Sequence, residues 1–269
     1  MTAAVLALAA VVAGAVAAVV GFGIGSLLTP LLALSAGTQL AVAAISVPHA
    51  AATAVRFWRL RRWVDRRVVV SFGITSAAGG LVGALLHSRA SNRALAVVFG
   101  LILVFVAMSE LSGLARRMRF RGPAGWLAGA LSGAFGGLVG NQGGIRSAAL
   151  LGFDLDRQAF VATATAIGLV VDAARMPVYL VTEGREMLRI WPLILVATIG
   201  TLAGTLGGVR LLGGMPETVF RRVVAVMLLL LGVWMAVGAK ACRESAGSPA
   251  GLHAPLRLPQ QPGDALGAR

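Results

Sequence analysis

Long apolar stretches separated by short polar segments run along most of the chain. A helix that spans a bilayer needs about 20 mostly apolar residues, and eight stretches approach that length. They are residues 3–20, 40–57, 68–86, 94–113, 122–140, 158–180, 190–209 and 220–239. This pattern predicts an all-α integral membrane protein with about eight transmembrane segments.

The composition supports a membrane protein and argues against a soluble enzyme. Hydrophobic residues make up 58% of the 269 positions, and charged residues only 13%. A typical soluble domain has about 25% charged residues, so a soluble chain of this size would lack the polar groups to cover its surface. The 35 glycines fit close helix packing in lipid, where small residues let backbones approach each other.

The basic residues indicate how the chain is oriented in the membrane. The net charge is +14, and the arginines form short clusters without the aromatic residues or long basic helix expected of a nucleic-acid-binding protein. No nucleic-acid partner is therefore expected. The clusters at 59–67 and 116–121 fall on one side if every segment crosses, and the positive-inside rule makes that side cytoplasmic. We predict a multi-pass protein of a bacterial-type cytoplasmic (inner) membrane, with both termini in the cytoplasm.

The two halves of the chain align at an offset of 119 residues. Aligned pairs include Gly21 with Gly140, Gly25 with Gly144, Ser46 with Thr165, and Arg56 with Arg175. We therefore predict a first transmembrane repeat (1–115), a basic cytoplasmic linker (116–121), a second transmembrane repeat (122–240) and a disordered cytoplasmic tail (241–269). Each repeat contains four segments. Internal repeats are typical of secondary transporters, which bind substrate near the repeat interface.

A glycine-rich helix break opens each repeat. Irregular backbone is tolerated within a membrane only where it faces protein or a watery cavity. The short helix after each break would begin inside the protein with free N–H groups and a positive dipole end, which suits an anion. The candidate substrate ligands are Gly21, Gly23, Gly25 and Ser26 in the first break and Asn141, Gln142, Gly143, Gly144, Arg146 and Ser147 in the second.

A simpler explanation of these glycines is close packing between crossing helices. Two observations favour a binding site instead. The breaks occur at matching positions of the two halves, and the second break carries Asn141, Gln142 and Arg146, which packing alone does not require.

The chain resembles the sulfite exporter TauE/SafE family of membrane proteins over residues 3–240. The resemblance rests on the duplicated eight-segment layout, on Gly-Phe-Gly-Ile-Gly-Ser-Leu-Leu-Thr-Pro-Leu-Leu at 21–32, and on the stretch at 140–151. It implies a secondary carrier of small anions, often sulfur-containing organic or inorganic ones. The chain departs from the family pattern at Ala149, where a proline is usual, and at Arg146, which replaces an apolar residue. These departures indicate a subfamily with its own substrate.

Several charged residues fall at membrane depth. Asp172 and Arg175 are three residues apart on one helix face, so they form either a self-neutralising structural pair or part of a substrate or proton path. Arg56 aligns with Arg175, and guanidinium groups suit sulfonate, sulfite or carboxylate oxygens. Asp172 either holds an arginine in place or takes a coupling proton. His49, next to Pro48, either bonds a group freed by the proline or carries a proton.

No catalytic motif is present in the sequence. It has no P-loop and no Cys/His metal spacing, and His87 is expected in a loop. We predict no enzyme activity, cofactor or metal. The predicted function is secondary transport of a small anion by alternating access, coupled to a proton or sodium gradient or driven by the anion gradient. The alternative is a non-transporting subunit that anchors or assembles another complex. The sequence leaves the oligomeric state open.

Overall fold

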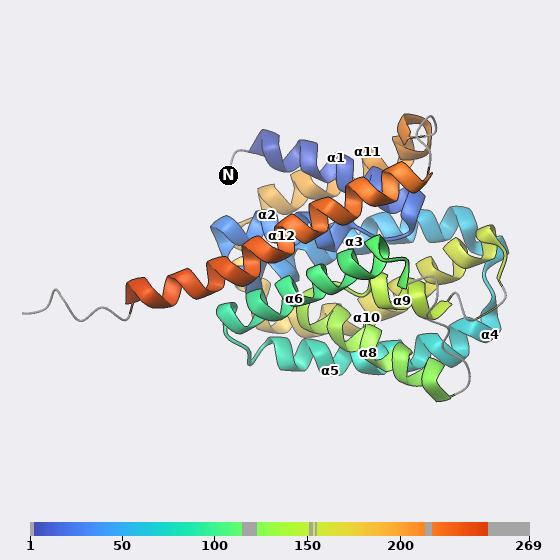
Figure 1. Ribbon diagram of the computed structural model, residues 1–269, viewed down its shortest axis with the longest axis horizontal. Helices are drawn as coiled ribbons and strands as arrows, with labels where there is room; N and C mark the ends of the chain where they lie inside the picture. Colours follow the sequence, from blue (N-terminus) through green and yellow to red (C-terminus); the bar gives the residue numbers. More distant parts are fainter. Residues whose placement is uncertain (1–2, 115–122, 151–152, 154, 213–216, 247–269) are drawn as a thin grey trace, which may run out of the picture.

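The chain folds into a bundle of α-helices, most of which run side by side along its length (Figure 1). The computed structural model describes residues 3–114, 123–150, 153, 155–212 and 217–246. No strand occurs in these residues, which confirms the all-α prediction. The linker expected at 116–121 lies outside the described residues, as does the tail from residue 247 onward.

A helix corresponds to each of the eight apolar stretches. These are α1 (Ala3–Val20), α3 (Thr38–Leu60), α5 (Ile74–His87), α6 (Asn92–Leu111), α8 (Pro123–Val139), α10 (Arg157–Arg189), α11 (Trp191–Leu212) and α12 (Glu217–Ala246). The shorter elements are α2 (Ile24–Ala36), η1 (Arg61–Trp63), α4 (Arg66–Val68), the π-helical η2 (Val69–Gly73) and α9 (Gly143–Leu150).

Five of the described helical stretches are long and apolar enough to cross a membrane by themselves. They are Thr38–Trp63, Arg66–His87, Asn92–Leu111, Gln158–Arg189 and Trp191–Gly208. The membrane character of the fold is therefore confirmed, whereas the number of eight crossings stays a prediction.

Three sequence-based boundaries differ from the structure. α10 continues to Arg189 rather than ending near residue 180, because the following Glu, Arg, Met and Leu residues favour a helix. α12 continues to Ala246, beyond the expected start of the tail at 241. His87 is the last residue of α5 and is fully buried, not placed in a loop.

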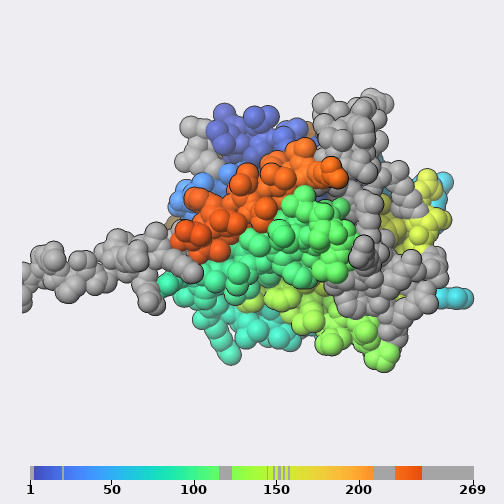
Figure 2. Space-filling model, viewed as in Figure 1, coloured from blue at the N-terminus to red at the C-terminus, as the bar shows by residue number. Residues whose placement is uncertain are grey.

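The outer surface of the bundle carries large apolar side chains, as contact with lipid requires. Figure 2 shows the face that α12 and α6 cover. On α12 the exposed side chains include Leu230, Val233, Trp234 and Val237, and on α6 they include Leu101, Phe105 and Met108. A soluble protein rarely exposes so large an apolar patch.

Small residues let the helices pack in pairs that join the first half of the chain to the second. α1 packs on α11, α5 on α8, α6 on α12 and α3 on α10. A Cβ atom added to Gly83 of α5 would lie 2.1 Å from the Ala134 carbonyl oxygen of α8. One added to Gly204 of α11 would lie 2.0 Å from the Val11 carbonyl oxygen of α1. Only glycine permits backbones to approach this closely.

Both predicted helix breaks are present. α1 ends at Val20 and α2 begins at Ile24, while α8 ends at Val139 and α9 begins at Gly143. The residues that directly follow α1 and α8, Gly21 and Gly140, have φ values of +87° and +73°. This left-handed conformation is accessible to glycine at little cost and turns the chain out of the helix.

Candidate functional site

The two breaks lie against each other inside the bundle. A Cβ atom added to Gly25 would lie 2.4 Å from the Gly140 carbonyl oxygen, and one added to Gly143 would lie 2.2 Å from Cβ of Phe22. Between them is a small cavity lined by Phe22, Gly23, Gly25, Ser26, His49, Gly140, Asn141, Gln142, Gly143 and Arg146. Residues separated by more than a hundred positions therefore form one site.

The cavity is too small for an anion in this structure. Its volume is about 10 Å³, which is room for roughly one water molecule. A polyatomic anion is larger, so a substrate could enter only if the two breaks moved apart.

Polar side chains in the cavity have hydrogen-bonding atoms without a partner among the described residues. These atoms are Nδ2 of Asn141, Nε2 and Oε1 of Gln142, and Nε and Nη1 of Arg146. The three side chains belong to residues that are 4%, 3% and 2% exposed. An unpartnered buried polar group costs about 1–3 kcal/mol. The four unpartnered nitrogen donors in this cavity therefore indicate a binding site for a ligand that accepts hydrogen bonds.

The buried charges around the cavity are predominantly positive. In the described residues, the buried charged side chains are those of Arg56, Arg146, Arg175 and Asp172. Three guanidinium groups thus accompany one carboxylate. Such an excess of buried positive charge is costly unless an anion offsets it.

Arg56 and Arg175 hold equivalent carbonyl groups at the two breaks. Nη1 of Arg56 donates to the carbonyl oxygen of Ala17, and Nη1 of Arg175 donates to that of Gly136. Both the arginines and their acceptors are 119 residues apart, the offset at which the halves align. The acceptors lie in the last turns of α1 and α8, where each carbonyl also accepts a backbone hydrogen bond of 3.0 Å, from Gly21 to Ala17 and from Gly140 to Gly136. Each arginine therefore adds a second hydrogen bond to a carbonyl at the end of an interrupted helix.

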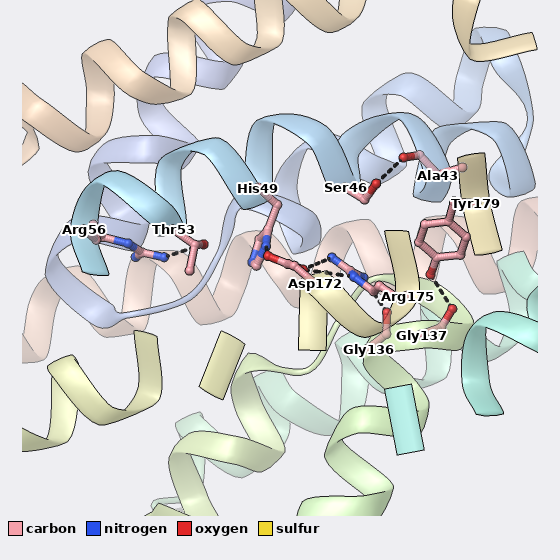
Figure 3. A network of polar contacts seen from close by, with 10 residues as sticks. All are labelled: Ala43, Ser46, His49, Thr53, Arg56, Gly136, Gly137, Asp172, Arg175 and Tyr179. Carbon is pink, nitrogen blue, oxygen red and sulfur yellow. Dashed lines mark hydrogen bonds and ion pairs between the residues drawn. The ribbon is translucent and has the colours of Figure 1, made fainter. Parts of the chain in front are cut away.

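A second matching contact accompanies each arginine (Figure 3). Nη2 of Arg56 donates to Thr53 Oγ1 at 3.3 Å. Arg175 contacts Oδ1 of Asp172 through Nε at 3.0 Å and through Nη2 at 2.7 Å. Thr53 and Asp172 are again 119 residues apart. The second half therefore carries a carboxylate where the first half has a neutral hydroxyl.

His49 connects the cavity to this ion pair. Its Nδ1 lies 2.7 Å from Oδ2 of Asp172 (Figure 3), and His49 also lines the cavity. The aligned position in the second half is Gly168, where an added Cβ would lie 2.9 Å from Nη1 of Arg146. The guanidinium of Arg146 therefore occupies space that a side chain at position 168 would need.

A family model for the sulfite exporter TauE/SafE proteins matches residues 6–235. The chain belongs to the TauE/SafE family. It is accordingly a multi-pass membrane transporter of the sulfite exporter type, which favours transport over the role of a non-transporting subunit. No curated protein and no solved structure matches the chain.

The structure of this TauE/SafE protein brings most of the predicted site residues together. Gly23, Gly25, Ser26, Asn141, Gln142, Gly143 and Arg146 line the cavity, and so does His49. Gly21 lies in the first break and Ser147 in α9, and neither lines the cavity; Gly144 is the second residue of α9. Arg56 and Arg175 contact helix-end carbonyls. His49 bonds Asp172 rather than a group freed by Pro48.

Two residues near the site were not predicted from the sequence. Tyr179 donates its hydroxyl to the Gly137 carbonyl oxygen, and Nδ1 of His87 lies 2.8 Å from the Leu138 carbonyl oxygen. With Arg175 on Gly136, these side chains satisfy three consecutive carbonyls at the end of α8. In the sequence, each of these two residues is a single polar residue in an apolar segment. That pattern does not show which carbonyl group accepts its hydrogen bond.

Proposed function

We propose that this protein carries a small anion through the cavity between the two breaks. The observation that carries the proposal is Arg146, a buried guanidinium with two unpartnered nitrogen atoms in a cavity that also holds the unpartnered amides of Asn141 and Gln142. Planar donors of this kind suit sulfite, sulfonate or carboxylate oxygens. The preference for a sulfur-containing or organic anion follows from the family.

Backbone N–H groups at the start of α2 add to the anion site. No side chain caps this helix at Gly23, so its first amides and the positive end of its dipole are available to a ligand. Gly25 and Ser26 of this turn line the cavity. The anion would therefore be held between α2 from one half and the Asn141–Arg146 segment from the other.

The small volume of the cavity and the duplicated design support alternating access. The substrate could reach the site only when the contacts of Gly25 with Gly140 and of Phe22 with Gly143 open toward one side of the membrane. In this proposal the transmembrane repeats 1–115 and 122–240 move relative to each other, while Arg56 and Arg175 stay bonded to the ends of α1 and α8. Arg56 retains one unpartnered atom, Nε, and its delocalised guanidinium charge adds to the positive charge near the site.

The inner membrane and cytoplasmic termini belong to the same proposal. They are supported by the arginine cluster after α3, which continues into η1 and α4. In it the Arg61 guanidinium lies 4.0 Å from the centre of the Trp58 ring, and both residue types favour the membrane interface.

Flux into proteoliposomes tests the proposal. Labelled sulfite, sulfate, methanesulfonate and acetate would be offered to vesicles with wild-type protein, Arg146→Gln, or the control Arg185→Gln, whose arginine is exposed on α10. We expect at least one anion to enter faster than into empty vesicles. Arg146→Gln should lower that flux by about 100-fold, as removal of a key buried donor does, and Arg185→Gln should not. Equal flux through both variants, or none through wild-type protein, would contradict the proposal.

A further inference from the structure

His49 and Asp172 are arranged so that the ring of the histidine has one fixed tautomer. The Asp172 carboxylate is contacted by Arg175 through two nitrogen atoms, at 3.0 and 2.7 Å, and by Nδ1 of His49 at 2.7 Å. A carboxylate paired with an arginine is ionised and can only accept hydrogen bonds. Nδ1 must therefore carry a proton and donate it, which leaves Nε2 without a proton in the neutral ring.

Nε2 is the ring nitrogen that remains for the cavity. His49 lines the cavity, and Nε2 has no hydrogen-bond partner among the described residues. The His49 side chain is 10% exposed, and its Nε2, unlike that of His87, is not one of the buried side-chain atoms that lack a partner. An unprotonated Nε2 presents a lone pair to the place where an anion would lie, and the two repel. A protonated Nε2 presents a donor, and the two attract.

We infer that His49 is the coupling site, and that a proton on Nε2 and the anion bind together at the cavity between the two breaks. The inference rests on the proposed function, since it specifies the coupling ion and its direction. By linkage, a proton that favours the anion is favoured by it to the same degree. One proton and one anion would thus cross in the same direction, and for a monovalent anion the cycle carries no net charge.

Four charged residues on three helices surround His49. Asp172 and Arg175 face it from α10, Arg56 lies further along α3 itself, and Arg146 shares the cavity from α9. α2 contains no titratable residue, and α6 and α11 carry charged residues only near their ends. Asp172 is the one carboxylate of this group, and it is already engaged by Arg175. Among these side chains, His49 is therefore the one that can gain a proton, on Nε2, and present it to the cavity.

The first test uses wild-type protein with methanesulfonate, which stays ionised across the working pH range. Proteoliposomes would contain a pH-sensitive dye and be given an inward methanesulfonate gradient. We expect the lumen to acidify as the anion enters. An inside-alkaline pH difference of one unit should drive accumulation by about tenfold, and a potassium-valinomycin potential should leave it unchanged. Anion entry that moves no protons would overturn the inference and leave the proposed function standing. If neither methanesulfonate nor any other anion of the panel crosses, the inference and the proposed function are both overturned. If another anion of the panel is carried instead, the same test is made with that anion.

The second test compares two histidine variants by the ratio of protons to anions moved. His49→Gln keeps a donor for Asp172 but removes the titrating nitrogen, so whatever flux remains should be uncoupled from protons. His87→Gln is the matched control, because this second buried histidine bonds the Leu138 carbonyl and does not line the cavity. It should keep the wild-type ratio. A purely structural His49 would change the amount of flux and not the ratio, and an unchanged ratio in His49→Gln would reject the assignment.

Discussion

The buried ion pair of Asp172 and Arg175 gives a sharp prediction for stability around the cavity. Asp172 is fully buried and Arg175 is 1% exposed. An Asp172→Asn substitution keeps the shape of the side chain but removes the only buried carboxylate among the described residues. The guanidinium of Arg175 then stays in a low-dielectric setting with its Gly136 contact and no counter-charge.

The expected loss is large compared with the stability of a protein. Removing one partner of a buried ion pair costs about 3–5 kcal/mol. With roughly 2–4 °C per kcal/mol for a chain of this size, we expect the apparent Tm of the detergent-purified protein to fall by roughly 10 °C. Intrinsic tryptophan fluorescence during heating measures it.

The aligned position in the first half supplies the control. Thr53 accepts one hydrogen bond of 3.3 Å from Arg56, so Thr53→Val should cost about 1 kcal/mol. Adding Arg175→Gln to Asp172→Asn should recover part of the lost Tm, because the uncompensated charge is removed. An Asp172→Asn protein that melts no lower than Thr53→Val would refute this reasoning.

Four further substitutions separate binding from packing. Gln142→Leu should raise the Tm, since two unpartnered polar atoms that cost about 1–3 kcal/mol each are removed, and should abolish anion flux; a lower Tm would argue against an idle polar site. Gly204→Ala should lower the Tm by several degrees because its Cβ meets Val11, whereas Gly184→Ala, with open space around it, should raise the Tm because alanine stabilises a helix interior by about 0.5–1 kcal/mol relative to glycine; equal shifts would contradict the packing. Gly21→Ala, at φ +87°, should cost about 1–2 kcal/mol in chemical unfolding although nothing lies near its Cβ, and no cost would contradict the strained geometry.

The helix breaks could be predicted from the sequence because their cause is local. Each glycine weakens a helix, and both breaks occur at glycine-rich runs, although the pair Gly79 and Gly80 lies within the continuous helix α5. The cavity residues Asn141, Gln142 and Arg146 were predictable for a similar reason, since polar side chains beside an interrupted helix need a polar surrounding.

The role of Arg56 and Arg175 could not be predicted in the same way. The offset of 119 residues identifies them as a pair, but not Ala17 and Gly136 as their acceptors. A guanidinium suits a substrate oxygen and a helix-end carbonyl equally well, and the choice depends on how α3 and α10 pack beside the breaks. The partner of His49 depends on the same packing, because Asp172 lies 123 residues away in the chain.

Labelling of Ser26 tests the central claim most directly. Ser26 lines the cavity and is 3% exposed, so a Ser26→Cys variant in a Cys242→Ser background reports on the cavity alone, since Cys242 is the single natural cysteine. A membrane-impermeant thiosulfonate carrying a sulfonate group would be added to vesicles of either orientation. The account predicts labelling from both sides, slowed by the transported anion, and loss of that protection in Arg146→Gln. Labelling from one side only, or labelling that no anion slows, would contradict it.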